Sequence, residues 1–556
     1  MKTTFKYDHY YKYEEMLDVI NYFNDNYKDF FTKKIIGTST LNKEIIACIL
    51  SDNSKSYLKK PAMYIDGNTH AGEVTGSMAA IYFVDYYLTN LNEFKQLLKD
   101  YTIYVIPRIA VDGAEEYLTT PNTLRSLNKE YKYQHDGLIE KDLDDDGVIR
   151  MMKVKDDLGA WVENGNDFNL SLREPDQIDG DFYNLYIEGE IENYSNNNFK
   201  VQDLKFGMDF NRNYPFGWFN DARQKGAGDY PLSNPETKAV VDFVINHPNI
   251  NIVSTNHTCG GVFLSPPGTY PSSEGNKFDM KVYKTIGEMA TKETGYPVVN
   301  IFDSFITDKA NYSSGAFDDY CYENHGIYAY TIELWDIYNK IKKPVDWKNF
   351  KKPEINDDIK TVAALAKWVK EVCPEELKPW TKVMHPQLGE VELGGVNYKF
   401  TYQNPPAKML LDEIEKASKF YIRYLKSMSK IVVKKAYVTQ IKDDIYQIDL
   451  TIANSGYLPT YLSEAAKKAK VNKPIEITLN IDNDKFISGH KITKIDELEG
   501  FANINTGMFS YSRVITTSSN KQFKDLKWIV KADKGEVISI DINSEKAGYL
   551  NHKIIV

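Results

Sequence analysis

Two histidines and a glutamate have the types and spacing to hold a metal ion. Residues 70–73 are His-Ala-Gly-Glu, and a third candidate ligand, His257, lies far along the chain. Zinc accepts imidazole nitrogen and carboxylate oxygen, and a catalytic zinc site keeps one position for water. Bound zinc lowers the pKa of that water from about 15.7 to about 7, which makes hydroxide available at neutral pH. The three residues therefore predict a zinc centre that activates water.

The elements around these residues should bring them together. His70 follows the apolar, strand-like run 62–66, and a helix-like stretch begins at Glu73. His257 ends the apolar run 251–256. Open α/β sheets bind ligands at the carboxyl ends of their strands, so we expect both histidines at one edge of a sheet. A His-x-x-Glu pattern is common by chance, and the prediction depends on the rest of the chain.

Three further segments carry side chains with useful chemistry. Residues 208–215 contain the pair Asn211-Arg212, residues 311–315 contain Tyr312, and the apolar run 330–335 places Glu333 near its end. The planar fork of arginine matches a carboxylate bidentately, which lysine cannot do. A carboxylate beside a zinc-bound water can take a proton and pass it to a leaving amine.

Taken in order, these motifs resemble the zinc carboxypeptidase family typified by carboxypeptidases A and B. The resemblance covers roughly residues 8–430 and suggests a bacterial-type member with an insertion and a C-terminal β-domain. It implies a metallocarboxypeptidase that removes C-terminal residues from peptides, with one zinc per chain and a peptide with a free C-terminal carboxylate as substrate.

The resemblance also implies a role for each matching residue. Glu333 would be the general base, and an arginine after residues 111–113 would polarise the scissile carbonyl. Arg125 has the matching spacing, and Arg108 is the weaker alternative. The remaining implied roles are zinc ligation by His70, Glu73 and His257, binding of the substrate carboxylate by Asn211 and Arg212, and closure over it by Tyr312. Asp318 or Asp319 lies near the family's specificity position, and an acidic side chain there would favour substrates with a C-terminal Lys or Arg.

Two other functions share parts of this pattern. Relatives with the same core hydrolyse peptidoglycan stem peptides or side-chain amides. A catalytically silent peptide- or carbohydrate-binding protein is the alternative from another class, but such proteins often lose the base or a ligand, and this chain has both.

Composition and charge argue against several classes of protein. The net charge of −10 provides no basic stripe for nucleic acid. The four cysteines are scattered without a Cys-x-x-Cys pair, which argues against a disulfide framework or a thiolate zinc site. No apolar run reaches membrane-spanning length. The first residues lack the apolar core of a signal peptide, so we expect a cytoplasmic protein.

Apolar patterning predicts two domains. Strand-like runs alternate with helix-like stretches through residues 1–430, which predicts an α/β domain with a mostly parallel mixed sheet flanked by helices. The expected strands are 34–36, 45–50, 62–66, 102–107, 250–256 and 327–333, and the expected helices are 11–26, 74–88, 235–246, 358–372 and 408–427. Short alternating runs from residue 431 to residue 556 predict a smaller all-β sandwich as an accessory domain.

Residues 129–205 are rich in Asp, Glu, Asn and Tyr and predict a surface insertion that rims the active-site cleft. A solvated decoration is the alternative. Within it, Asp142, Asp144 and Asp146 precede Gly147 like the first half of a calcium loop. Position twelve is Lys153, where such a loop needs a glutamate. Calcium is therefore the second candidate cofactor, and a solvated acidic turn is the alternative.

Overall fold

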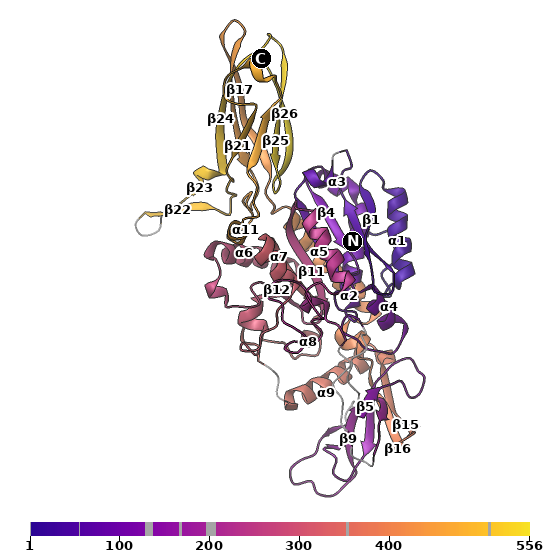
Figure 1. Ribbon diagram of the computed structural model, residues 1–556. Helices are drawn as coiled ribbons and strands as arrows, with labels where there is room; N and C mark the ends of the chain where they lie inside the picture. Colours follow the sequence, from indigo (N-terminus) through magenta and orange to yellow (C-terminus); the bar gives the residue numbers. More distant parts are fainter. Residues whose placement is uncertain are drawn as a thin grey trace.

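The structure is a computed structural model of the chain. It describes residues 2–54, 56–127, 137–165, 170–195, 199, 207–351, 355–509 and 513–556, without the side chains of residues 355–358, 505–509 and 513–515. The ends of the predicted insertion, near residues 129–136 and 200–205, therefore lie outside the described residues. Figure 1 shows a large central body, an elongated β-domain at one end and a small group of strands at the other.

An eight-stranded mixed sheet forms the centre of the body, with strand order β1-β2-β4-β3-β11-β14-β12-β13. The central neighbours β4, β3, β11 and β14 pair in parallel, whereas β1 and β2 at one edge and the β12–β14 pair are antiparallel. The strands are β1 (Phe31–Thr38), β2 (Glu44–Leu50), β3 (Ala62–Gly67), β4 (Thr102–Ile106), β11 (Ile250–Thr258), β12 (Val262–Ser265), β13 (Val298–Asn300) and β14 (Tyr328–Leu334).

Helices cover both faces of this sheet. One face packs against α1 (Tyr13–Asn26), α2 (Val74–Thr89), α3 (Leu91–Asp100), α6 (Lys277–Thr294) and α10 (Ala407–Leu425). The other face packs against α4 (Val111–Thr119), α5 (Pro235–Asn246) and α7 (Phe317–His325). The short α8 (Ile337–Lys340) and the longer α9 (Ile355–Val372) follow the last central strand.

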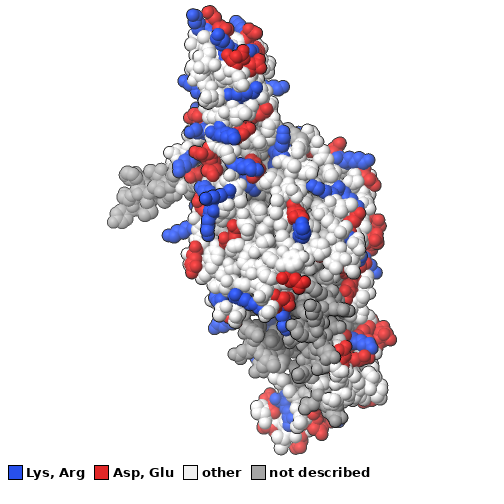
Figure 2. Space-filling view, in the orientation of Figure 1, with Lys and Arg blue, Asp and Glu red and all other residues white. Residues whose placement is uncertain are grey.

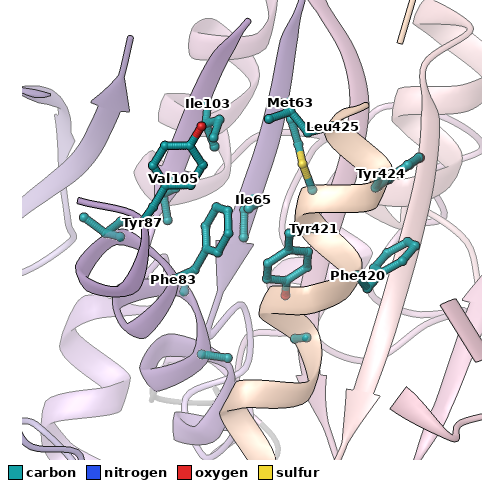
Figure 3. Close-up of a cluster of buried hydrophobic side chains, with 14 of the residues drawn as sticks. Met63, Ile65, Phe83, Tyr87, Ile103, Val105, Phe420, Tyr421, Tyr424 and Leu425 are labelled. Atoms are coloured by element: carbon teal, nitrogen blue, oxygen red, sulfur yellow. The ribbon is translucent and has the colours of Figure 1, made fainter. Parts of the chain in front are cut away.

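Alternation along the strands divides the interior into two cores. Met63 and Ile65 of β3 face α2 and α10, as Figure 3 shows, whereas Tyr64 between them faces the opposite core. Successive side chains of a strand point to opposite faces of the sheet. A strand covered on both faces needs apolar residues at every position, and this explains the continuous apolar runs of the sequence.

A smaller β region lies at the end of the body remote from the β-domain (Figure 1). Its six-stranded sheet has the order β15-β16-β6-β9-β7-β8, and a separate pair joins β10 to β5. Strands from the predicted insertion thus share one sheet with two strands that come after α9, through the pairing of β6 with β16. They are β5 (Gly137–Glu140), β6 (Met151–Lys155), β7 (Trp161–Val162), β8 (Ser171–Leu172), β9 (Phe182–Ile187), β10 (Gly189–Glu192), β15 (Leu377–His385) and β16 (Gly389–Val396).

The C-terminal region is built of antiparallel sheets with the orders β17-β18-β24-β20 and β21-β19-β25-β26. Alternate residues such as Ile448 and Leu450 of one sheet and Ile540 and Ile542 of the other share one core. The strands are β17 (Ile431–Lys442), β18 (Ile445–Asn454), β19 (Ile475–Leu479), β20 (Phe486–Ser488), β21 (Ile492–Ile495), β24 (Phe523–Lys531), β25 (Val537–Ser544) and β26 (Gly548–Ile555), with a hairpin of β22 (Ile504–Phe509) and β23 (Arg513–Ser518) and a helix α11 (Glu464–Ala469).

Buried polar contacts join the β-domain to the catalytic body. Lys546 donates from Nζ to the carbonyl oxygens of Pro248 (2.6 Å) and Ile250 (2.9 Å), at the start of β11. Ser463 donates to the carbonyl of Gly326 at the end of α7 (2.7 Å). These bonds attach the C-terminal domain to the end of the central sheet where β11 and β14 begin. The carboxyl ends of β3 and β11 lie at the other end of the sheet.

The fold class predicted from the sequence is confirmed: a mixed sheet flanked by helices is followed by all-antiparallel β sheets. The exact domain limits stay a prediction. Among the described residues, no helix has the length and apolar character required to cross a bilayer. On the face shown in Figure 2, basic and acidic side chains are interspersed and form no continuous basic stripe.

Candidate metal and substrate site

Close backbone packing fixes the loop that carries His70 and Glu73. The loop joins β3 to α2, and Glu73 is the residue that precedes the first turn of α2. A Cβ atom on Gly76 would lie 2.5 Å from the carbonyl oxygen of Asn256 in β11, so only glycine lets α2 approach the sheet this closely. Asn68 donates to the carbonyl oxygens of His70 (2.5 Å) and Ala71 (3.0 Å) and holds the loop in shape.

The three predicted ligands converge on one point. His70 Nδ1 lies 2.8 Å from Glu73 Oε1, and His257 Nδ1 lies 2.8 Å from Glu73 Oε2. The two Nδ1 atoms are 3.1 Å apart. All three side chains are buried, with at most 3% of each residue exposed. Burial would raise the pKa of Glu73, but the neighbouring His70 and His257 lower it below its ordinary value, which keeps a carboxylate available as a ligand.

Asp209 connects this group to Arg125. Its Oδ1 accepts from His70 Nε2 (3.1 Å) and its Oδ2 accepts from Arg125 Nε (3.0 Å). Arg125 also donates to Glu73 Oε1 (3.2 Å), and 30% of its side chain is exposed. Burial opposes ionisation of Asp209, but Arg125, Arg212 and His70 hold its pKa well below the ordinary value. The carboxylate therefore fixes the His70 ring and the arginine at once.

Glu333 lies opposite the group on the neighbouring strand. It is in register with His257 in the parallel pairing of β11 and β14, and both residues line the same cavity. Burial and the negative charge of Glu73 raise the pKa of Glu333 to about 8. A carboxyl group that holds a proton near neutral pH suits general acid–base chemistry.

The cavity has a volume of about 540 Å³ and continues past the ligands to Asn211 and Arg212. These two belong to a short 3-10 turn, Phe210–Arg212, whose preceding residue Asp209 accepts from the Asn211 backbone N–H (2.9 Å). Asn211 Oδ1 accepts from the Phe317 N–H (2.9 Å) and is thereby oriented. Arg212 donates to the Asn211 carbonyl (2.7 Å), and among the described residues no carboxylate lies within ion-pair distance of its guanidinium.

Two adjacent carboxylates line the same cavity. Asp318 Oδ2 accepts from Thr331 Oγ1 (2.8 Å), and Asp319 Oδ1 accepts from the Gly268 N–H (2.9 Å). Burial and the charge of Asp318 raise the pKa of Asp319 well above its ordinary value. The two neighbouring carboxyl groups therefore favour a shared state in which Asp319 keeps its proton.

The remaining candidates lie elsewhere. The Tyr312 ring packs against Phe219 and Phe302, with centroid separations of 5.7 and 6.1 Å, and it does not line the cavity, although its neighbours Asn311 and Ser313 do. Its closure over a substrate stays a prediction. Arg108 is buried and donates to the carbonyl of Tyr11 (2.7 Å), away from the cavity, so Arg125 is the arginine positioned at the site.

The structure gives the calcium prediction no support. Carboxylate oxygens of Asp142, Asp144 and Asp146 come close together on the β5–β6 connection. Lys378 of β15 forms ion pairs with Asp144 and Asp146, and Arg150 lies 2.6 Å from Asp146. Side-chain cations from the protein itself therefore neutralise this acidic turn.

Sequence reasoning missed three residues of the site. Asp209 stands in the segment that contains Asn211-Arg212, and an acidic residue beside that pair was the available signal. Tyr398 and Gln403 also line the cavity, but they follow β16 in a segment without a recognisable motif. Gln403 Oε1 accepts from Tyr117 OH (2.8 Å), which holds it beside the His70–Glu73 loop.

The donor set fits a zinc ion. Two imidazole nitrogens and a carboxylate are a combination that catalytic zinc sites use, and the ligand atoms lie within 4.8 Å of one another. The contact between Asp209 and His70 Nε2 leaves Nδ1 as the nitrogen that faces Glu73 and His257, which is the arrangement of a metal-ligating histidine with a carboxylate behind it.

Known protein families match two parts of the chain. The model of the zinc carboxypeptidase family matches residues 16–360, and a domain family of unknown function matches residues 430–555. Carboxypeptidases A1 of Rattus norvegicus and of Mus musculus are each 27% identical to the chain over 142 residues, which are 24% of this chain and 33% of each relative. The chain thus spans about a third of the length of the curated relatives it matches.

Solved structures show more distant likeness. Thrombin activatable fibrinolysis inhibitor has a TM-score of 0.39 at 19% identity, with 66% of this chain and 75% of that chain covered. Carboxypeptidase A from Helicoverpa armigera has a TM-score of 0.38 at 15% identity, with 65% and 72% covered. Murein-tripeptide amidase from Escherichia coli O157 has a TM-score of 0.26 at 13% identity, with 61% and 90% covered.

Proposed function

Because the chain belongs to the zinc carboxypeptidase family, we propose that it is a metallocarboxypeptidase that removes single residues from the free C-terminal end of peptides. The observation that carries the proposal is the composition of one cavity. The candidate zinc ligands, Glu333, Arg125 and the pair Asn211-Arg212 all line it.

Each residue has a separate task in this proposal. His70, Glu73 and His257 would hold the zinc, which when bound supplies a Lewis acid that makes water nucleophilic at neutral pH. Glu333 takes the proton of the attacking water and returns it to the leaving amine. Arg125, fixed by Asp209, donates to the scissile carbonyl oxygen as negative charge develops on it.

Recognition of the chain end falls to Arg212 and Asn211. The guanidinium of Arg212 lies in the cavity without a carboxylate partner among the described residues, so a substrate carboxylate can supply the missing charge. Asn211 is oriented by the Phe317 N–H through its carbonyl oxygen, which leaves its amide N–H groups to donate to the same carboxylate. An endopeptidase has no use for this pair.

The decisive experiment compares matched peptides with free and amidated C-termini. Amidation removes the charge that Arg212 binds, at a cost of a few kcal/mol. Wild-type kcat/KM should therefore fall by about a hundredfold or more, since about 1.4 kcal/mol corresponds to a factor of ten. The variant Arg212→Met should lose activity toward the free acid and change little toward the amide. Equal cleavage of both peptides by the wild type, or cleavage inside the chain, would contradict the exopeptidase proposal.

A further inference from the structure

A second cavity adjoins the candidate site. It has a volume of about 460 Å³, within the range of about 300–1,000 Å³ typical of ligand pockets. Its wall contains five apolar side chains, namely those of Pro121, Leu124, Val148, Ile149 and Ile187. The last three come from the β5–β6 connection and from the end of β9, which belong to the predicted insertion.

The two cavities share part of their lining. Arg125, Tyr398 and Gln403 line both of them. The zinc ligands, Arg212 and Asp319 line only the first. The second cavity therefore opens beside Arg125 and extends away from the part of the site that would bind a C-terminal carboxylate.

The direction of a bound peptide follows from these positions. In the proposed function, the C-terminal carboxylate contacts Arg212 and the scissile carbonyl contacts Arg125. The residue on the N-terminal side of the scissile bond then continues past Arg125. Its side chain has the second cavity next to it, because Arg125 and Tyr398 belong to both walls.

Two charged side chains of the second cavity are engaged within the protein. Lys399 donates from Nζ to the carbonyl oxygens of Tyr117 and Thr120, both at 2.8 Å. Glu140 Oε2 accepts from Thr123 Oγ1 (2.8 Å). The surface left for a ligand is mainly apolar, and Val148 and Ile149 are only half-buried although their side chains are branched and aliphatic.

We propose that this cavity binds an aromatic or branched aliphatic side chain of the residue immediately N-terminal to the scissile bond. The inference rests on the proposed function and extends it to a specificity element that the insertion and the segment after β16 build together. Tyr398, Lys399 and Gln403 lie beyond the residues 16–360 that the family model matches. Preference at this position thus depends in part on residues outside the range that the family model matches.

The test uses acetylated dipeptide acids with a constant C-terminal residue and Ala, Phe or Asp before it. Burial of a large apolar side chain should give the wild type a kcat/KM about tenfold higher for Phe than for Ala. Ile149→Asp should reduce this ratio to about two or less, because an uncompensated carboxylate then faces the apolar side chain. Ile149→Lys should raise the ratio of Asp to Ala by about threefold, a gain that damage to the fold cannot produce.

The control is Leu158→Asp, which places the same charge on the same segment at a residue that is 89% exposed. It should leave the ratio of Phe to Ala as in the wild type. A wild type that cleaves the dipeptides without preference, or an Ile149→Asp variant that keeps the preference, overturns the inference and leaves the proposed function standing. A zinc-loaded wild type that cleaves none of the free acids overturns the proposed function itself.

Discussion

Asp209 is the residue whose replacement tests the geometry of the site most directly. In Asp209→Asn the carbonyl oxygen should take the place of Oδ1, because that oxygen accepts two N–H groups, one from His70 and one from the Asn211 backbone. The amide NH₂ then takes the place of Oδ2 and meets the Nε–H of Arg125, so that two donors face each other. The substitution thus preserves the contact with His70 and breaks the contact with Arg125.

The expected loss of zinc affinity, which acts through His70, differs from the expected loss of kcat/KM, which acts through Arg125. Loss of negative charge behind a metal-ligating histidine weakens metal binding by about 10–100-fold. Because Asp209→Asn keeps the hydrogen bond to His70, its loss of zinc affinity should lie near the lower value. A hydrogen bond to a charged group contributes about 1.5–3 kcal/mol. If Arg125 acts on the scissile carbonyl, kcat/KM at saturating zinc should fall by about 10–100-fold.

The assay separates the two effects. Competition with a chelator gives the zinc affinity, and kcat/KM is then measured with excess zinc. In an Arg125→Met background the further cost of Asp209→Asn in kcat/KM should shrink to about threefold or less, because neighbouring substitutions that remove one contact are not additive. Asp242→Asn is the control, since Asp242 pairs with Lys238 on the exposed face of α5. A zinc-saturated Asp209→Asn enzyme within about threefold of wild type would refute the role given to the Asp209–Arg125 contact.

Three further predictions concern the ligands, the base and specificity. The purified protein should contain about one zinc per chain, and His257→Ala should lose most of it by elemental analysis, because fewer protein ligands remain; full retention would remove His257 from the ligand set. Glu333→Gln should keep its zinc but lose about 10²–10⁴-fold in kcat, because an amide cannot carry the proton; turnover near wild type would exclude Glu333 as the base. The acidic pair Asp318 and Asp319 should favour a C-terminal Lys or Arg, so Asp318→Asn should lower the kcat/KM ratio of Lys to Leu substrates by about tenfold; an unchanged ratio would contradict this assignment.

The local hydrophobic pattern of the sequence was sufficient to predict the central strands and helices. The apolar runs 62–66 and 250–256 correspond to β3 and β11, and the helix-like stretch 74–88 corresponds to α2, because strands buried on both faces and the helices that cover them leave continuous signals in a sequence. The structure brings the predicted ligands together for the same reason: His70 follows β3 and His257 lies near the end of β11, and the carboxyl ends of these two strands are neighbours.

The insertion left a weaker signal. Its strands are short, and most positions in β9 are only half-buried, with Asn184 interrupting its apolar residues. β6 pairs with β16, a strand from more than two hundred positions further along the chain, and such pairing leaves no local pattern. The acidic turn at residues 142–146 resembles a metal-binding loop in sequence, but one of the cations that neutralise it, Lys378, lies in β15, the strand that pairs with β16.

The segment after β16 lies beyond the residues 16–360 that the family model matches, yet it contacts the candidate site. Asn404 accepts from the Thr75 N–H (3.1 Å) and donates to the Gly72 carbonyl (2.7 Å), on both sides of Glu73. Gln403 contacts Tyr117 of α4 and lines the cavity. One short segment therefore braces the turn that carries a candidate zinc ligand and also lines the cavity assigned to the substrate. β16 leads into this segment and also pairs with β6 of the insertion. A continuous series of contacts therefore joins the insertion to the turn that contains Glu73.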